Sequence, residues 1–211
     1  MPTPDHVIFA PGVDFGTVRG SDSAAQINHL RAHIDNHIGT QIRSVGFREV
    51  DGEQKRHHES PFPLAIMTCI ALEALGSIFL TEEAGTTDGR TVFTHACNEI
   101  DSALYRPAKK GFFGDLKKQF PEFDFKKCYS VADLLYKTFR NKMAHDYMSG
   151  CIYLTGEDAD KWDYDTAWLM LNPFWFAEET FNLIPKFFDS IQESGDRIKS
   201  CEKYVALLLR N

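Results

Sequence analysis

One segment of twenty residues, 61–80, constrains the fold more than any other feature of the chain. It is apolar on nearly every side of a helix and contains a single charged residue, Glu73. A helix that is hydrophobic all round is buried in a protein core or crosses a membrane. Because Glu73, Thr68 and Ser77 interrupt the apolar run, a membrane span is not expected. The segment therefore predicts a buried central helix on which the other elements pack.

The composition is that of a globular protein kept in a reducing compartment. Hydrophobic residues make up 43% and charged residues 25% of the 211 residues, a length that suits one domain. The five cysteines include no CxxC pair, and Cys69 and Cys128 lie among apolar residues, as small core side chains do. The first residues carry no basic charge ahead of an apolar run, so no signal peptide is expected. Together these features predict a cytoplasmic protein.

Charge is distributed unevenly along the chain. The net charge of −7 argues against strong non-specific binding to nucleic acid, which requires a basic surface. Residues 106–142, however, contain ten basic and four acidic residues. Such a basic region in an acidic protein either faces an anionic ligand or forms a solvated helical face.

Hydrophobic periodicity predicts a mainly α-helical fold, an up-and-down bundle of about five helices with a small β-hairpin. Residues 1–20 show no clear period and predict an irregular N-terminal arm on a single domain that spans 1–211. The apolar runs 151–154 and 167–171, separated by an acidic loop, predict the hairpin. Residues 40–50 alternate weakly, which fits either a short strand or an extended connector. Helices are expected over 21–39, 61–80, 91–105, 124–144 and 174–210, the last kinked at Pro185 and divided near Gly195.

The residues with the most suggestive chemistry are Arg140-Asn141-Lys142-Met143-Ala144-His145, at the end of a predicted amphipathic helix. The planar guanidinium of an arginine can bind two phosphate oxygens at once, and a histidine with a near-neutral pKa can accept a proton. On an α-helix, positions five apart differ by about 140° around the axis and by about 7.5 Å along it. Arg140 and His145 can therefore meet through the long arginine side chain, or where the helix ends.

This segment resembles the R-x4–6-H motif of the HEPN superfamily, in which a polar residue such as Asn141 often follows the arginine. The specific resemblance covers about ten residues, and the helical layout extends it loosely over 61–211. It implies a metal-independent endoribonuclease without a cofactor, in which Arg140, Asn141 and His145 are catalytic. It also implies that RNA or a nucleotide is bound and that two motifs meet in a homodimer.

Two other copies of the spacing, Arg90 to His95 and Arg31 to His37, have Thr and Ala after the arginine. They lie near the start of a predicted helix or on its outer face. The Arg140 copy is favoured because it has the asparagine, the preceding amphipathic helix and the following hairpin.

Two residues are predicted to support the site. A carboxylate in an apolar helix is costly unless it is paired, and Arg140 is the natural partner of Glu73. The alternatives for Glu73 are a purely structural salt bridge and an exposed edge of the helix. Tyr147 and Asp146 flank His145, where either could orient the imidazole or contact the substrate, although capping of the helix end is favoured for Asp146.

Two further patterns have simpler interpretations. His29, His33 and His37 form an i, i+4, i+8 stripe, and such pairs can bind zinc. No cysteine or carboxylate in this helix completes an obvious set, so a solvated or interface stripe is favoured over a metal site. The tryptophans and tyrosines near the predicted hairpin could stack bases, but their acidic neighbours favour core packing or a subunit interface. These aromatic residues are Tyr153, Trp162, Tyr164, Trp168, Phe174 and Trp175.

Three functions follow as hypotheses. The first is a HEPN-like endoribonuclease, the toxic part of a defence system or of a toxin–antitoxin pair, with an antitoxin protein as partner. The second is a non-catalytic HEPN-like module that binds a nucleotide, RNA or a protein partner. The third is a small helical structural protein. No membrane partner is expected for any of them.

Overall fold

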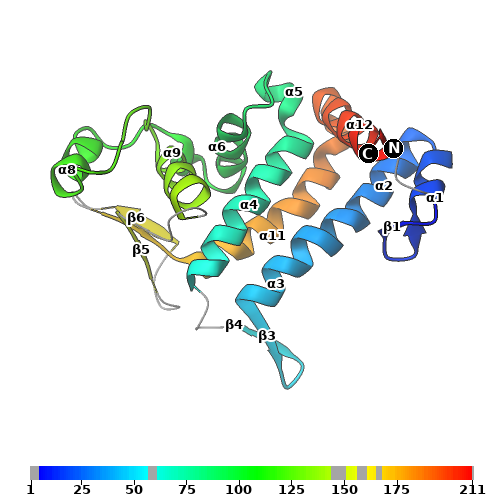
Figure 1. Ribbon diagram of the computed structural model, residues 1–211, viewed down its shortest axis with the longest axis horizontal. Helices are drawn as coiled ribbons and strands as arrows, with labels where there is room; N and C mark the ends of the chain where they lie inside the picture. Colours follow the sequence, from blue (N-terminus) through cyan, green and yellow to red (C-terminus); the bar gives the residue numbers. More distant parts are fainter. Residues whose placement is uncertain (1–4, 57–60, 144–150, 156–160, 165–167, 211) are drawn as a thin grey trace.

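The computed structural model describes residues 5–56, 61–143, 151–155, 161–164 and 168–210, with Gln54 and residues 140–143 described by their backbone alone. The molecule is elongated, and its long helices run side by side through the middle (Figure 1). The prediction of a mainly helical fold with a small β component is confirmed. The expected number of about five helices is too low, because periodicity does not reveal helices of one or two turns.

Helix α4 (Pro61–Phe79) lies at the centre of the fold, as predicted. Its side chains Leu64, Leu72 and Leu75 are fully buried. Among the described residues it is the one helix long and apolar enough to cross a membrane, but 56% of that apolar stretch is buried inside the protein. Such burial is typical of a core helix. The main neighbours of α4 are α3 (Thr40–Gly46), α6 (Gly89–Ile100), α11 (Pro173–Ser190) and α12 (Gly195–Arg210).

The N-terminal residues, from residue 5 onward, form a hairpin and a short helix instead of the predicted irregular arm. Phe9 is fully buried, and its ring stacks on that of His33 with centroids 4.5 Å apart. These strands are two and three residues long, too short for an alternating pattern to be visible in the sequence. The elements are β1 (Ile8–Ala10), β2 (Val13–Asp14), which pairs antiparallel with β1, and α1 (Phe15–Gly20).

Gly39 does not end the first long helix, as had been expected. Its backbone is helical, with φ −58° and ψ −49°, and the helical segment continues to Gly46. A glycine ends a helix when it adopts the left-handed conformation, and Gly39 does not adopt it. The segment consists of α2 (Ser23–Ile34), the π-helix η1 (Asp35–Gly39) and α3.

A second hairpin follows α3 and projects from the body of the molecule (Figure 1). Strands β3 (Phe47–Val50) and β4 (Glu53–Arg56) pair antiparallel. Between them Asp51 and Gly52 have φ values of +56° and +80°. Two left-handed residues make the tight turn that fits the twist of a hairpin, and Asp-Gly is a preferred sequence for it. The strand alternative for 40–50 is thus correct only for the end of that range.

The predicted hairpin near the C-terminal third has a different pairing. Strand β5 (Ile152–Leu154) runs parallel to β7 (Leu169–Leu171), so the two expected partners do not form a hairpin. A third strand, β6 (Trp162–Tyr164), comes from the stretch expected to be a loop and pairs antiparallel with β7. The sheet order is therefore β5-β7-β6.

The remaining helices refine the predicted boundaries. The helix expected over 91–105 is divided at Asp101, which caps a short second helix. Asn172 caps α11, because its side chain accepts hydrogen bonds from two backbone amides. Pro185 lies inside α11, and α12 begins at Gly195. The other elements are α5 (Thr81–Ala84), α7 (Ser102–Tyr105), α8 (Phe112–Gln119), α9 (Val131–Leu135), the π-helix η2 (Tyr136–Met143) and the short η3 (Ile191–Glu193).

Helices α4 and α6 approach each other closely at Gly76. A Cβ atom placed on Gly76 of α4 would overlap the backbone carbonyl of Val92 in α6. Backbone atoms cannot move aside as a flexible side chain can. The two helices can approach this closely only because residue 76 has no side chain.

We therefore predict that Gly76→Ala lowers the free energy of unfolding by about 1–3 kcal/mol, the usual cost of overpacking a core. The matched control is Gly114→Ala in α8, where nothing lies within 4 Å of the added Cβ. There alanine should leave stability unchanged or raise it, because it lowers the entropy of the unfolded chain. Urea unfolding of both variants measures the difference, and equal midpoints would contradict the crossing.

The packing of His33 against the N-terminal hairpin makes stability depend on pH. Burial lowers the pKa of His33 below 6.5 and the neighbouring His37 also lowers it, whereas the hydrogen bond between the His33 ring and the Phe9 carbonyl, at 2.6 Å, raises it. Below about pH 6.5 the unfolded chain then binds more protons than the folded one. Stability should therefore fall as the pH falls from 7 to 5.

His33→Gln should reduce this pH dependence, whereas the same change at the exposed His6 should not. Urea midpoints measured at pH 7 and pH 5 give the slope for each protein. An unchanged slope in His33→Gln would show that another group is responsible.

Candidate functional site

The helix that carries the predicted motif begins at Val131, not near Asp124. The Ser130 side chain caps it, and the Asp133 carboxylate accepts a hydrogen bond from the Ser130 amide at 3.0 Å, which completes a capping box. All five residues of α9 are buried. Asp124 lies outside the helix, where it binds the Lys126 amide and pairs with Lys137. The capping box therefore fixes where the motif helix starts and how it is oriented.

After α9 the helix continues as the π-helix η2, which packs against α4. Arg140 and Asn141 belong to η2 by their backbone. Their side chains, together with His145 and Tyr147, lie outside the described residues, so the predicted catalytic contacts stay predictions. In a π-helix each N–H bonds to the carbonyl five residues earlier, so residues five apart lie on the same side.

Glu73 is half-buried on the side of α4 that faces η2 and the start of α6, which argues against an exposed helix edge. A Cβ atom placed on Gly89 would overlap its Oε1 atom and would lie 3.1 Å from the Tyr136 hydroxyl. The Glu73 carboxylate is therefore next to Tyr136, one helical turn before Arg140. Its pairing with Arg140 stays a prediction.

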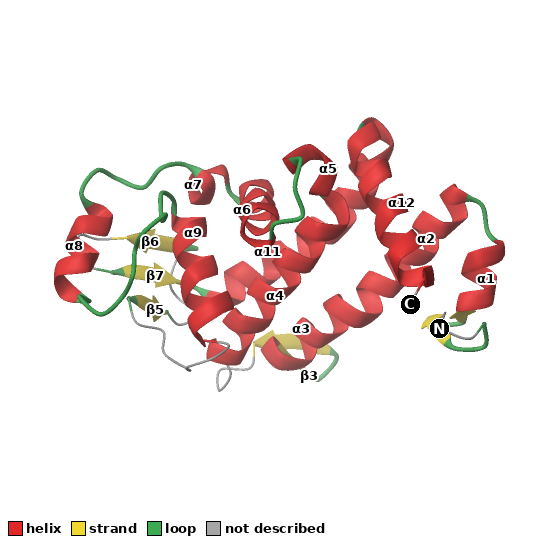
Figure 2. Ribbon diagram, turned by 45° about the horizontal axis from the view of Figure 1, so that its top comes forward, coloured by secondary structure: helices red, strands yellow, loops and turns green. Residues whose placement is uncertain are grey.

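The second copy of the spacing, which was not favoured from the sequence, lies in a pocket. Arg90 and His95, both on α6, line a cavity of about 590 Å³ together with Tyr105, Lys127 and Tyr129. The cavity is bounded by α6, the end of α7 and the chain before α9, which are neighbours in Figure 2. In the sequence, the signal for this pocket was the spacing from Arg90 to His95. The other walls come from residues distant in the chain, so no local pattern links them to Arg90.

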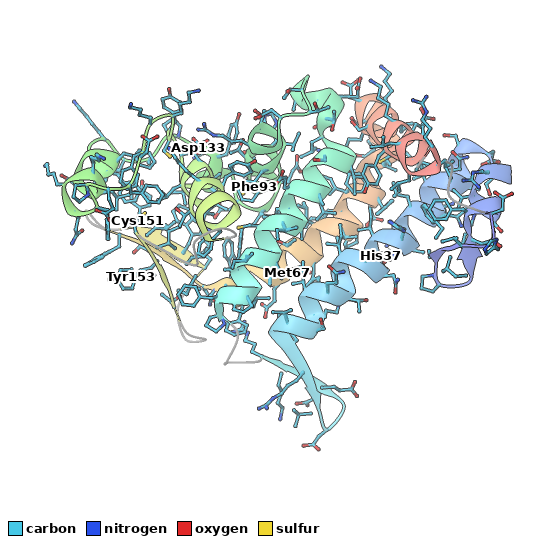
Figure 3. The ribbon with its side chains drawn as sticks, in the orientation of Figure 1. His37, Met67, Phe93, Asp133, Cys151 and Tyr153 are labelled. Carbon is cyan, nitrogen blue, oxygen red and sulfur yellow. The ribbon has the colours of Figure 1, made fainter. Side chains whose placement is uncertain are left out.

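An ion pair holds Arg90 in place at the side of this cavity. Its Nε and Nη2 atoms donate to one oxygen of Asp133 at 3.0 and 2.7 Å, and Nη2 also donates to the Lys127 carbonyl. The other Asp133 oxygen accepts from the amides of Tyr129 and Ser130 at 2.9 and 3.0 Å. Figure 3 shows Asp133 at this junction of α6 and α9. Arg90 is thus primarily a structural link between the two helices.

His29 and His33 of the histidine stripe contact the N-terminal elements. His33 contacts Phe9, and His29 lies 3.4 Å from the Ser21 hydroxyl. Within the described part of the chain, no group of three histidine, cysteine or acidic residues is arranged to hold a metal ion. The stripe thus belongs to the contact between α2 and the N-terminal elements.

The cysteines and most of the aromatic cluster serve as packing groups, but Tyr153 of that cluster is 52% exposed. All five thiols are buried, and burial raises the pKa of Cys128 to about 11 and that of Cys201 to about 12. Neutral buried thiols are poor nucleophiles. Trp162 stacks on Tyr164 across 5.9 Å beside the core, in agreement with the core-packing interpretation.

Comparisons of the chain with protein families, curated proteins and solved structures found no match.

We predict that Asp133→Ala lowers the free energy of unfolding by about 2 kcal/mol, because it removes a helix cap and leaves Arg90 without its carboxylate. Asp115→Ala is the matched control, since its pair with Lys118 is exposed and such pairs are worth about 0–1 kcal/mol. Thermal unfolding of both variants measures the contrast. Equal losses would mean that the Arg90–Asp133 pair does not link the two helices.

Proposed function

We propose that the chain is a HEPN-like, metal-independent endoribonuclease with Arg140, Asn141 and His145 as catalytic residues. Glu73 supports them by pairing with Arg140, and Tyr147 by orienting His145 or contacting the RNA. The long helices form an up-and-down bundle, and two chains associate as a cytoplasmic homodimer. The protein acts as the toxic part of a defence or toxin–antitoxin system, held inactive by an antitoxin protein.

The proposed reaction is an internal attack within the RNA strand. His145 removes the proton from a 2′-hydroxyl, and the 2′-oxygen forms a bond to the adjacent phosphorus. The bond from phosphorus to the 5′-oxygen of the next nucleotide breaks, and that oxygen takes a proton from solvent. Arg140 binds the phosphate oxygens, on which negative charge accumulates in the transition state. The products are a 2′,3′-cyclic phosphate and a 5′-hydroxyl.

The observation that carries this proposal is the position of Arg140 and Asn141 on the π-helix η2. On an α-helix, residues five apart, such as Arg140 and His145, point in different directions. On a π-helix, residues five apart lie on the same side. The proposal requires the π-helix to extend to His145, so that the imidazole and the guanidinium reach the same phosphate. Short π-helical segments are frequent at functional sites.

The Glu73 carboxylate gives further support. It lies beside Tyr136, on the face of α4 that packs against η2. A carboxylate at this place can hold a guanidinium from the next turn of η2 in one orientation. A fixed guanidinium binds phosphate with less loss of side-chain entropy than a free one.

A non-catalytic HEPN-like module that binds a nucleotide, RNA or a protein partner is the second candidate. The acidic net charge of −7 favours it, because nucleases acting on RNA in general need to attract a polyanion. In that case Glu73, Arg140 and His145 form a structural polar network without turnover.

We predict that the purified protein cleaves single-stranded RNA in the presence of EDTA, because no step needs a metal ion. His145→Ala should lower the cleavage rate at least about 100-fold, the usual contribution of a general base. His6→Ala, which removes an exposed histidine remote in sequence, should cleave like the wild type. Gel analysis of labelled RNA over time measures the rates.

Wild-type cleavage by His145→Ala would remove the catalytic proposal. Loss of activity in His95→Ala but not in His145→Ala would instead show that catalysis takes place in the cavity at Arg90. Absence of cleavage by the wild type, together with tight RNA binding, would favour the non-catalytic module.

A further inference from the structure

The cavity beside Arg90 has no lining residue from η2 within the part of the chain that the structure describes. Its volume of about 590 Å³ is in the range of small-molecule sites. The chemistry of its walls indicates what kind of ligand it can hold.

The small hydroxyl groups of the cavity are already occupied by internal hydrogen bonds. Thr94 donates to the Thr91 carbonyl at 2.9 Å, and Thr91 donates to the Asp88 carboxylate at 2.8 Å. Ser130 donates to Asp133 at 3.0 Å. These hydroxyl protons are therefore not free to bond a ligand, whereas the hydroxyl oxygens can still accept hydrogen bonds from one.

The aromatic side chains of the cavity are exposed. Tyr129 is 71% exposed and Tyr105 is 43% exposed, and both line the opening. The ring of His95 meets that of Tyr105 edge to face at 5.4 Å. Within the described part of the chain, no hydrogen bond to the hydroxyl of either tyrosine is found. Exposed aromatic faces beside a cavity are stacking surfaces for planar rings, and every nucleobase has such a face.

The charges around the cavity favour an anion beside Lys127. This lysine lines the cavity, is exposed, and its ammonium has no acidic partner among the described residues. Asp133 is neutralised by Arg90. Hydrogen bonds from Thr91 lower the pKa of Asp88, another residue of the cavity wall, so this carboxylate is charged and repels anions. A phosphate is therefore favoured at Lys127.

We propose that this cavity binds one nucleotide of single-stranded RNA, with the base stacked on Tyr105 or Tyr129 and a phosphate at Lys127. The inference rests on the proposed function for its ligand class, and it adds a second contact between protein and RNA. Single-stranded nucleic acid is bound in general by this combination of stacking rings and basic groups. A strand held here and at η2 would be fixed at two points.

The test is RNA binding by fluorescence anisotropy, with a labelled single-stranded oligonucleotide in EDTA. The protein is His145→Ala, so that cleavage does not remove the ligand. Adding Tyr129→Ala or Tyr105→Ala should raise the Kd about tenfold, because a stacking ring is lost. Tyr129→Phe keeps the ring and should bind like its parent. Tyr153→Ala, which removes an exposed tyrosine of β5 outside the cavity, should also be unchanged.

The lysine is tested by Lys127→Gly. Lys127 has φ +66°, a conformation that glycine adopts without strain, so this change removes the charge and keeps the backbone. Its Kd should rise several-fold at low salt and less at high salt, because the lost interaction is with a phosphate. Circular dichroism of each variant checks that the fold is retained.

The outcomes separate the cavity from the catalytic motif. Unchanged affinity in both tyrosine-to-alanine variants would overturn the cavity inference and leave the cleavage result as it stands. Absence of RNA binding by His145→Ala would overturn it too. If the wild type binds RNA without cleaving it, the endoribonuclease proposal is removed. Weaker RNA binding by the Tyr105→Ala and Tyr129→Ala variants would still support the cavity as an RNA site.

Discussion

The fold depends on the close crossing of α4 and α6, where the absence of a side chain at Gly76 lets the helix approach the Val92 carbonyl. This contact sets the position of α6 relative to the central helix. Because α6 is fixed, its first residue Gly89 lies against Glu73 of α4 and Tyr136 of η2. The Arg90–Asp133 pair then joins α6 to α9, the helix that leads into the predicted motif. One packing contact thus positions three helices around the candidate site.

The features that the sequence predicted well are local ones. The apolar segment 61–80 is buried because it has no polar face, and Asn172 with Pro173 starts α11 by capping its first turn. The features that were predicted wrongly depend on contacts between distant residues. The parallel pairing of β5 with β7 is an example, since either strand alone reads only as a short apolar run. Gly39 stays helical because its surroundings, and not its own preference, decide its conformation.

The candidate site shows the same division. The sequence points to Arg140, Asn141 and His145 through their spacing, and Glu73 through the cost of a carboxylate in an apolar helix. It gives no indication of the π-helix η2, because a pitch of this kind depends on packing against α4 and on the cap at Ser130. The spacing from Arg90 to His95 was a signal for the cavity, but the cavity itself could not be predicted, since its aromatic walls come from α7 and from the chain before α9. The spacing of residues along the sequence indicates which groups could react together. Tertiary packing determines which of these groups lie on the same surface.

The central claim is that a base and a guanidinium act on one phosphate of RNA without a metal ion. The most direct test is mass spectrometry of the ends produced when single-stranded RNA is incubated with the protein in EDTA. The proposed mechanism yields a 2′,3′-cyclic phosphate and a 5′-hydroxyl, and no cut beside a nucleotide whose 2′-hydroxyl has been replaced by hydrogen. A 3′-hydroxyl with a 5′-phosphate, or cleavage beside the deoxynucleotide, would contradict it.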